Sequence, residues 1–438
     1  MQLVTSFDRL IQPLAAEFTR PAFAKLQILL MGWLFAGRRT VTGMIVAAGV
    51  AGQRHHSVFH RLFSQDRWSC DAVGLQIFGL IQTRLDPQRP VRLALDDTLA
   101  RKRGPKVFGA GMHHDPQLSS RNTTVTVWGH SWVVLGVLVR LPFCPQRCFC
   151  LPVLVRLYLN QKAAKRARRA HRTRPEIGVE MLRVLCERFP DKRFHVAADS
   201  AYGGKSVLLN LPSNCDLTSR LPLDARLYGP IPVRQPGTNG RPRKRGDRLP
   251  SPDQMLDGRV ARRIELEVYG RRDRLRVVCI EARVFAAPDR ALRVVAIEAL
   301  SGGRGREVFY STDLDLTAEA VLGHYADRWS IEVTFRDAKQ SLGFDQPQGW
   351  SRQAASRTAP MALWLYSLVV LWFDQSGRQR WRAVYRPWYP RQSRASFADM
   401  LRTLRRESIR QTLLKTPLSG LGSRKVMQIL DTTLDAAA

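Results

Sequence analysis

Acidic side chains are scarce in this chain of 438 residues, which has 37 Asp and Glu residues against 69 Lys and Arg residues. The formal net charge is therefore 69 − 37 = +32. Such a balance argues against a cationic partner and predicts a polyanion, for which nucleic acid is the usual choice. A ribosome-associated protein and a peripheral membrane protein are the alternatives. The length predicts roughly two to three domains, and the 45% hydrophobic content is ordinary for a globular protein.

Long hydrophobic runs are also missing. Phe23 to Ala36 is apolar but short and contains Lys25, and Leu363 to Phe373 is shorter still. A helix that spans a membrane needs about 20 apolar residues. The N-terminus carries Asp8 and lacks the charged-then-apolar pattern of a signal peptide. We therefore expect no membrane partner and a cytoplasmic, nucleoid-associated location.

Cysteine is infrequent, with seven residues in the whole chain. A long chain with so few cysteines has no disulfide framework. Cys144, Cys148 and Cys150 are close together, but their spacing is not a standard zinc spacing and no second ligand pair follows. His113 and His114 lie upstream and are equally explained as surface polar residues. We expect reduced, structural thiols.

The periodicity of the chain predicts both helical and strand-rich parts. Apolar residues at helical spacing predict a helical, basic N-terminal module, which either recognises DNA ends or is a plain structural bundle. Apolar runs at 91–97, 124–141, 151–159 and 194–199, and alternation between 264 and 300, predict strands. Helices are predicted over 175–189, 317–342 and 359–373. The predicted domains are a helical DNA-binding domain (1–88), the first part of an α/β core (89–220), a β-rich insertion (221–315), the second part of the core (316–375) and a basic C-terminal region (376–438).

Two basic segments lie outside these predicted elements. Residues 162–174 form a basic run that we interpret as a solvated surface, with contact to phosphates as the second interpretation. In the C-terminal region, arginines alternate with aromatic residues that include Trp381 and Trp388. These aromatics either stack on bases or belong to a packed helix with surface arginines.

Acidic residues end two of the predicted strands. Asp96 and Asp97 end the strand that begins at Val91, and Asp199 ends the strand that begins at Phe194. The carboxyl ends of strands are where an α/β sheet opens to its ligands. An acid after a strand is often only a turn or cap residue. The strand positions alone therefore carry little weight.

The predicted helix at 317–342 gives a stronger signal. At about 100° per residue, with Tyr325 at zero, Arg328 falls near 300°, Glu332 near 340°, Lys339 near 320° and Arg336 near 20°. One stripe therefore combines an aromatic hydroxyl, an acid and several bases. The alternative is a surface helix with ion pairs between Glu332 and the arginines four residues away.

Other residues of the same helix point away from this stripe. Asp327 and Asp337 fall near about 200° and 120° on the same scale. An apolar stripe of Ile331, Phe335, Ala338 and Leu342 lies beside the polar one and is suited to docking on a sheet. The geometry thus selects Glu332 among the acids of this helix.

The spacing Y-x2-R-x3-E-x6-K, matched by Tyr325, Arg328, Glu332 and Lys339, resembles the YREK signature of bacterial insertion-sequence transposases of the DDE type with a long β insertion. Leu95-Asp-Asp-Thr98 and Ala198-Asp-Ser-Ala-Tyr-Gly203 occur in the order found in that group. The resemblance covers residues 20 to about 375. It implies an RNase H-like, mixed-sheet α/β catalytic core, with an inserted β-rich region and a helical N-terminal domain.

The identity of the first acid stays open within this resemblance. Relatives with the acid directly before Thr point to Asp97. Relatives that read Asp-acid-Thr, with Lys-Gly following, point to Asp96, although here Arg103 separates Lys102 from Gly104. We favour Asp96 and keep Asp97 as a candidate catalytic residue.

The resemblance implies metal-dependent cleavage of DNA. Asp96, Asp199 and Glu332 would hold two Mg²⁺ ions, for which Mn²⁺ substitutes. Tyr325, Arg328, Arg336 and Lys339 would bind DNA phosphates. The implied partners are the inverted-repeat ends of the element and target DNA, bound by a dimer. A nuclease without strand transfer and a catalytically inactive DNA-binding derivative are the rival readings.

Overall fold

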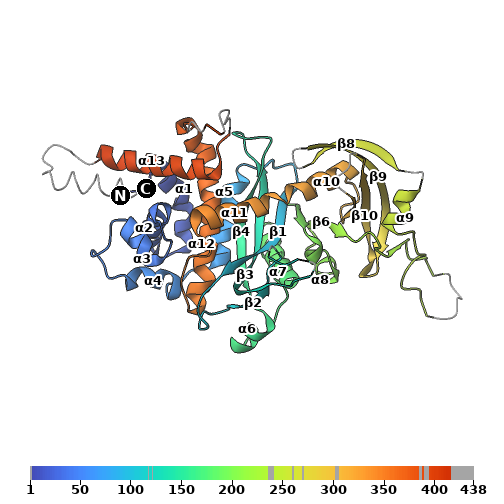
Figure 1. Cartoon of the computed structure of the whole chain (residues 1–438), viewed down its shortest axis with the longest axis horizontal. Coiled ribbons are helices and arrows are strands. Elements are labelled where there is room, and N and C mark those ends of the chain that lie inside the picture. Colours follow the sequence, from blue (N-terminus) through green and yellow to red (C-terminus); the bar gives the residue numbers. More distant parts are fainter. Residues whose placement is uncertain are drawn as a thin grey trace.

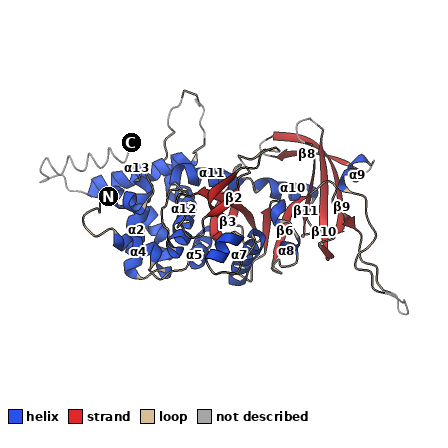
Figure 2. Cartoon of the chain, turned by 60° about the horizontal axis from the view of Figure 1, so that its bottom comes forward, coloured by secondary structure: helices blue, strands red, loops and turns tan. Residues whose placement is uncertain are grey.

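The computed structural model describes residues 2–415 apart from 117, 121, 235–240, 259–260, 269–270, 301–304, 384–386 and 389–393. The molecule is elongated, with the N-terminal helices at one end and strands β8–β10 at the other (Figure 1). Figure 2 shows the same division, with helices gathered at one end and strands at the other. The strand-rich core lies between the two ends.

The N-terminal region is helical, as the apolar periodicity predicts. Several helices begin at a Ser or Thr cap: the Thr19 side chain accepts a hydrogen bond from Ala22 N before α2, and Ser69 does the same for Ala72 N before α5. The helices of this region are α1 (Thr5–Ile11), α2 (Arg20–Phe35), α3 (Val41–Ala47), α4 (Ser57–Ser64) and α5 (Cys70–Gln82).

One mixed sheet runs through the core and the insertion in the order β2-β3-β1-β5-β6-β11-β10-β9-β7, with β4 paired to β3 and β8 to β9. The insertion therefore extends the core sheet through the β6–β11 pair. The strands are β1 (Val91–Arg101), β2 (Gly111–His114), β3 (Thr126–Arg140), β4 (Cys148–Tyr158), β5 (Phe194–Ala198), β6 (Cys215–Leu221), β7 (Leu227–Tyr228), β8 (Arg262–Val268), β9 (Arg271–Val284), β10 (Ala287–Ala299) and β11 (Arg306–Ser311).

Helices cover both faces of this sheet. Helix α12 is the buried helix of the core, and its Trp364 Nε1 and Ser367 Oγ donate hydrogen bonds of 2.9 Å to carbonyls of β4. It is long and apolar enough to cross a membrane, but 89% of its apolar window is buried inside the protein. The α-helices after the N-terminal region are α6 (Gln161–Arg166), α7 (Arg174–Arg188), α8 (Lys205–Leu208), α9 (Pro252–Asp257), α10 (Ala318–Asp327), α11 (Ser330–Leu342), α12 (Arg352–Trp372) and α13 (Phe397–Lys415).

The prediction of a single long helix from Thr317 to Leu342 is wrong, because the structure has two helices there, α10 and α11. Between them, the amides of Arg328 and Trp329 bond to carbonyls only three residues back, which tightens the turn. Helix α10 packs in a small hydrophobic cluster with β9–β11, whereas α11 packs on β1 and β4 (Figure 1). The junction is needed because each helix docks on a different part of the sheet.

The seven cysteines are free thiols, as expected. Cys144 and Cys150 are buried, and Cys148 packs against the same hydrophobic core. In the C-terminal region Trp381 packs on the core and Trp388 is exposed. The neighbouring Tyr385 and Tyr389 lie outside the described residues.

Two buried histidines join α10 to the core sheet. The rings of His195 (β5) and His324 (α10) lie 4.6 Å apart in an edge-to-face arrangement, and His195 Nε2 is 2.7 Å from Thr218 Oγ1. Burial lowers the pKa of His195 to about 4 and that of His324 to about 3. Both rings are therefore neutral in the folded protein at neutral pH.

These histidines should make stability depend on pH. Below about pH 6.5 these histidines bind protons in the unfolded chain but stay neutral in the folded chain. The free energy of unfolding should therefore fall as the pH drops from about 6.5 to 4. The fall is up to about 1.4 kcal/mol per pH unit for each histidine. In urea unfolding, His324→Phe should show a shallower fall, whereas the exposed His114→Phe should follow the wild type. Equal slopes in all three proteins would contradict this account.

Candidate active site

The parallel pairing of β1 and β5 brings two acids together. Leu95 is in register with Ala198, so Asp96 and Asp199 follow at neighbouring positions on adjacent strands. Adjacent strands are about 4.8 Å apart. One oxygen of the Asp199 carboxylate accepts a hydrogen bond of 3.0 Å from Ala201 N, which caps the short turn after β5. Asp199 thus caps the turn after its strand, as acids in this position often do. The cap uses one carboxylate oxygen of Asp199 and leaves the other out.

Arg328 connects this pair of strands to helix α11. Its Nη1 donates to Asp96 Oδ2 at 2.7 Å and its Nη2 donates to Glu332 Oε1 at 3.1 Å. The Arg328 side chain is almost completely buried, whereas Glu332 is partly open to solvent. The guanidinium therefore stands between two of the three predicted acids.

Burial and the charge of Asp199 act on Asp96 and Glu332. Burial raises the pKa of Asp96 to about 7, against the attraction of Arg328 and with the help of the Asp199 charge. Burial also raises the pKa of Glu332, again opposed by Arg328 and reinforced by Asp199. Because the Asp199 charge acts on both partners of Arg328, the three carboxylates share one electrostatic environment. A cation bound among them would favour their charged forms.

Asp97 points to the opposite face of the sheet, since neighbouring residues of a strand alternate. Its carboxylate accepts a hydrogen bond of 3.0 Å from Tyr202 Oη and forms an ion pair with Arg174 Nε at 3.4 Å. Burial raises the pKa of Asp97, and these two partners oppose the rise. Asp97 therefore belongs to a network beneath helix α7, whereas Asp96 faces Arg328 and Glu332.

The remaining members of the predicted polar stripe have different surroundings. Tyr325 is buried against Phe309 at 4.8 Å between ring centroids, and the Arg328 guanidinium lies 5.3 Å from the Tyr325 ring. Burial lowers the pKa of Lys339, whose neighbouring charges are Asp345, Asp115 and Arg101. The structure thus brings Tyr325, Arg328 and Glu332 together and places Lys339 beside other acids.

Arg336 and the two acids that the helical geometry excluded have partners of their own. Arg336 is exposed and pairs with Asp337 at 3.1 Å, so the alternative pair between Glu332 and Arg336 is not the one formed. Asp337 also pairs with Arg147, and Asp327 pairs with Arg92 and Arg140. Asp327 and Asp337 are thus engaged in ion pairs away from Asp96, Arg328 and Glu332.

The sequence does not reveal the residues that give Asp96 and Asp97 different surroundings. Arg174 lies at the end of the basic run 162–174, and Tyr202 lies in the segment that follows Asp199. Both contact Asp97 from the α7 face of the sheet. The only sequence signal was the alternation of side chains along the strand, which shows that the two acids face opposite ways but does not show which way.

The donor set suits a hard divalent cation, because three carboxylates supply only oxygen ligands. Within the described residues, no three His, Cys, Asp or Glu side chains already stand close enough to hold a metal ion. Arg328 lies between Asp96 and Glu332 and donates to both. The three acids fit Mg²⁺ by the chemistry of their oxygen atoms, and two of them now bind a cationic side chain of the protein.

Two family models match the chain. One, described as DDE superfamily endonuclease, matches residues 13–276, which is more than half of the chain. The other, described as archaeal putative transposase ISC1217, matches residues 286–370. No curated protein matches the chain.

The chain therefore belongs to the DDE superfamily endonucleases. Together the two matches place it among the insertion-sequence DDE transposases, and the mixed α/β sheet agrees with the RNase H-like core of that superfamily. DDE superfamily enzymes use divalent metal ions, generally Mg²⁺, and transposase families imply binding to DNA. The large excess of basic residues fits such a partner.

Removal of the Arg328 charge should increase metal affinity. In Arg328→Gln, Asp96 and Glu332 lose the guanidinium that now neutralises them, so the affinity for Mn²⁺ at pH 8 should rise by about tenfold or more. Isothermal titration calorimetry without DNA measures this directly. Arg336→Gln removes an equal, exposed charge and should change the affinity little. An unchanged affinity in Arg328→Gln would show that the guanidinium does not occupy the position of the metal.

Proposed function

We propose that this protein is a DNA transposase that binds the ends of its element, cleaves them by metal-dependent hydrolysis and joins the freed 3′ ends to target DNA. The observation that carries the proposal is the convergence of Asp96, Asp199 and Glu332 from β1, β5 and α11 around Arg328. Family membership in the DDE endonucleases supports the same chemistry.

The proposed roles follow from charge and position. Asp96, Asp199 and Glu332 would hold two Mg²⁺ ions, which when bound activate the attacking oxygen and stabilise the leaving oxygen. Arg328 has two donors already aimed at oxygen atoms of acids, so the same pair of N–H groups can bind two oxygens of a phosphate. In this view Arg328 exchanges carboxylate oxygens for phosphate oxygens when DNA enters.

The other predicted phosphate ligands have different access to DNA. Arg336 is exposed on α11, while Lys339 is half-buried further along the same helix. Tyr325 lies under Arg328 and holds its guanidinium by ring contact. We propose that Arg336 and Lys339 bind phosphates beyond the scissile bond, and that Tyr325 positions Arg328.

Two DNA ends must be held together before they are joined to a target, so we propose a dimer on DNA, with Mn²⁺ able to replace Mg²⁺. The helical N-terminal region (1–88) is proposed to read the inverted repeat, and the protein is proposed to act in the cytoplasm at the nucleoid. The second candidate is a nuclease with the same site that joins no strands. A strand-transfer assay with pre-cleaved 3′-hydroxyl ends separates the two.

Substitution of Glu332 tests the acid on α11. Glu332→Ala should abolish Mg²⁺-dependent cleavage of duplexes that carry the inverted repeats flanking the gene. End binding in EDTA should stay within about twofold, because this acid makes no phosphate contact. Asp337→Ala is the control, since Asp337 lies on the same helix and pairs with Arg147. Cleavage by Glu332→Ala at the wild-type rate would contradict the assignment of Glu332 as a catalytic acid.

Two isosteric substitutions show whether Asp96 or Asp97 is the catalytic acid of strand β1. Asp96→Asn should abolish cleavage because the carboxylate beside Asp199 is lost. Asp97→Asn should keep measurable cleavage and instead lower the free energy of unfolding by roughly 1–3 kcal/mol, since it weakens the bonds to Arg174 and Tyr202. The opposite result, with Asp97→Asn inactive and Asp96→Asn active, would move the metal site to the other face of the sheet.

A further inference from the structure

The turn after β5, which carries Asp199, is held from different sides by buried hydroxyl groups. Arg328 donates hydrogen bonds to Asp96 and to Glu332. The Asp199 carboxylate instead accepts a hydrogen bond from Ala201 N of its own turn. The position of this carboxylate therefore follows the backbone of the turn, and whatever fixes that backbone also fixes the distance between Asp199 and Asp96.

Two of the hydroxyl groups come from the neighbouring strands β6 and β11. Ser219 Oγ donates to the carbonyl of Asp199 at 2.8 Å. Tyr310 Oη donates to the carbonyl of Gly203 at 2.7 Å. Ser219 and Tyr310 are in register on the antiparallel pair β6–β11, so their side chains are cross-strand neighbours on one face of the sheet. The two bonds therefore hold the first and the last residue of the turn 199–203.

The third hydroxyl group joins the turn to strand β1. Tyr202 Oη donates to Asp97 Oδ1 at 3.0 Å, one residue away from Asp96 along the strand. The side chains of Tyr202, Ser219 and Tyr310 are all buried. A hydrogen bond in such surroundings is electrostatically stronger than one in water. We refer to these three hydroxyl groups as the hydroxyl brace.

Gly203 leaves the space that two members of the hydroxyl brace need. A Cβ atom at this position would lie 2.6 Å from Ser219 Oγ and 3.0 Å from Tyr310 Oη. Glycine therefore allows both hydroxyl groups to approach the backbone closely. The segment Ala198-Asp-Ser-Ala-Tyr-Gly203 thus contains an acid, one residue of the brace and the glycine that admits the other two.

We propose that the hydroxyl brace holds Asp199 at the distance from Asp96 that a shared metal ion requires. Its three members are positioning residues, since groups that orient metal ligands shape a metal site without touching the metal. The inference rests on the proposed function, because it takes Asp199 as a metal ligand. Through Tyr310 on β11, the β-rich insertion acts on the position of this acid.

Metal affinity tests this role. Binding of Mn²⁺ is measured by isothermal titration calorimetry without DNA. Tyr310→Phe keeps the aromatic ring and removes one hydroxyl group, and Ser219→Ala removes another. Each variant should bind Mn²⁺ about tenfold more weakly, which is the lower end of the loss expected when a group that orients a metal ligand is removed. In cleavage assays the half-saturating Mn²⁺ concentration should rise by the same factor, while the rate at saturating Mn²⁺ stays within about threefold.

Ser367→Ala is the matched control for Ser219→Ala. The Ser367 hydroxyl is also buried and donates to a backbone carbonyl of a strand, at 2.9 Å. Both variants should lower the melting temperature by a similar amount, but Ser367→Ala should keep the wild-type affinity for Mn²⁺. An equal loss of affinity in Ser367→Ala, or wild-type affinity in both Ser219→Ala and Tyr310→Phe, would overturn the proposal.

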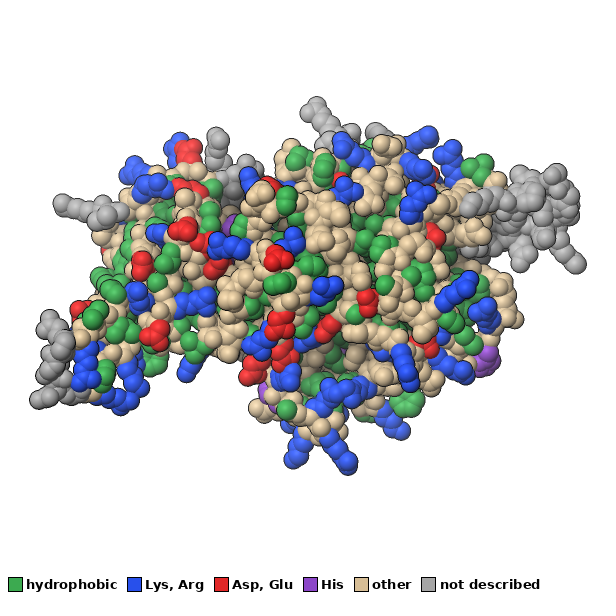
Figure 3. Space-filling view, turned by 180° about the vertical axis from the view of Figure 1, so that it is seen from behind, with side chains coloured by type: hydrophobic (Ala, Val, Ile, Leu, Met, Phe, Trp, Pro, Cys, Tyr) green, Lys and Arg blue, Asp and Glu red, His purple; other side chains and the backbone are tan. Residues whose placement is uncertain are grey.

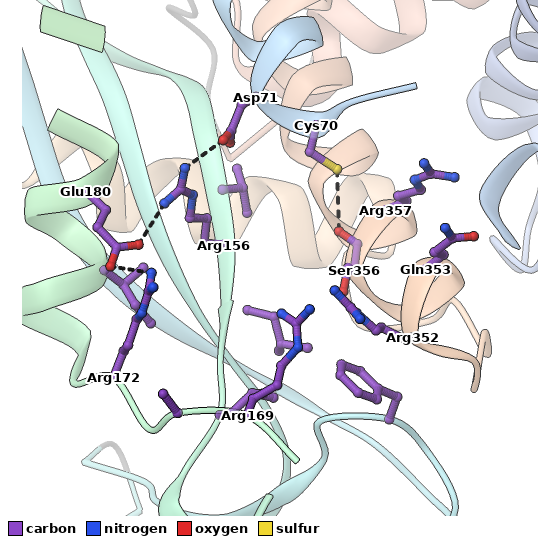
Figure 4. Close-up of a pocket in the computed structure, with 16 residues that line it drawn as sticks. Cys70, Asp71, Arg156, Arg169, Arg172, Glu180, Arg352, Gln353, Ser356 and Arg357 are labelled. Carbon is purple, nitrogen blue, oxygen red and sulfur yellow. Dashed lines mark hydrogen bonds and ion pairs between the residues drawn. The ribbon is translucent and has the colours of Figure 1, made fainter. Parts of the chain in front are cut away.

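Asp199→Asn separates this proposal from the proposed function. It should lose Mn²⁺ binding, whereas Asp71→Asn should keep it. Asp71 lies in a pocket of about 580 Å³ beside β4, where it binds Arg156 at 2.6 Å (Figure 4). Other exposed acids should compete poorly for Mn²⁺, because Figure 3 shows Asp and Glu interspersed with Lys and Arg on that face of the molecule.

The two possible failures give different results. Wild-type affinity in Asp199→Asn would contradict the proposed function, since Asp199 would then hold no metal ion. A loss of affinity in Asp199→Asn, together with wild-type affinity in Ser219→Ala and Tyr310→Phe, would contradict the role of the hydroxyl brace alone.

Hydrogen exchange tests the hydroxyl brace without any metal. The amides of Tyr202 and Gly203 bond to carbonyls within the turn, both at 3.1 Å. These amides should exchange about threefold to tenfold faster in Ser219→Ala and Tyr310→Phe, because each variant lacks one bond that keeps the turn closed. In Ser367→Ala they should exchange at the wild-type rate. Wild-type exchange in both Ser219→Ala and Tyr310→Phe would show that the hydroxyl groups do not hold the turn and would overturn the proposal.

Discussion

Parallel pairing of β1 with β5 concentrates negative charge at one end of the sheet, and the rest of the site compensates for it. Asp96 and Asp199 are one strand spacing apart because Leu95 and Ala198 are in register. Burial and the neighbouring acid raise the pKa of Asp96 to about 7, although Arg328 lies beside it. A buried pair of this kind needs a cation, and in this structure the cation is a side chain of the protein.

The position of Arg328 depends on two separate packing interactions. It lies in the tight turn between α10, which packs on the insertion strands, and α11, which packs on the core. The β6–β11 pair makes insertion and core one continuous sheet, so the two helices are held in a fixed relation. The insertion thereby helps to place Arg328 beside Asp96 and Glu332.

Local patterns in the sequence predicted the elements of the site well. Alternation and strand-end acids identified β1 and β5. Helical periodicity selected Glu332 over Asp327 and Asp337, and the structure places these two acids in ion pairs with Arg140 and Arg147. The family resemblance supplied the metal-dependent chemistry, and the family matches confirm that the chain is an insertion-sequence transposase of the DDE superfamily. These features depend on residues close together in the chain.

Features that depend on distant contacts could not be predicted in this way. The break between the helices at Arg328 arises because α10 and α11 dock on different strands. The spacing of apolar residues along the chain does not show which strands a helix will contact. The contacts that distinguish Asp97 from Asp96 come from Arg174 and Tyr202, which reach the sheet from α7 and from the turn after β5. The pocket beside β4 brings together residues from Cys70 to Arg357, which no local window contains.

The central claim is that Asp96, Asp199 and Glu332 form one metal site whose space Arg328 fills when no metal is bound. Anomalous diffraction from a crystal of the protein with its end DNA and Mn²⁺ tests this most directly. The account predicts anomalous peaks in contact with these three carboxylates and an Arg328 side chain moved from Asp96 to a phosphate. Peaks on the Asp97 face of the sheet, or Mn²⁺ at the three acids with Arg328 still bonded to Asp96 and Glu332, would contradict it.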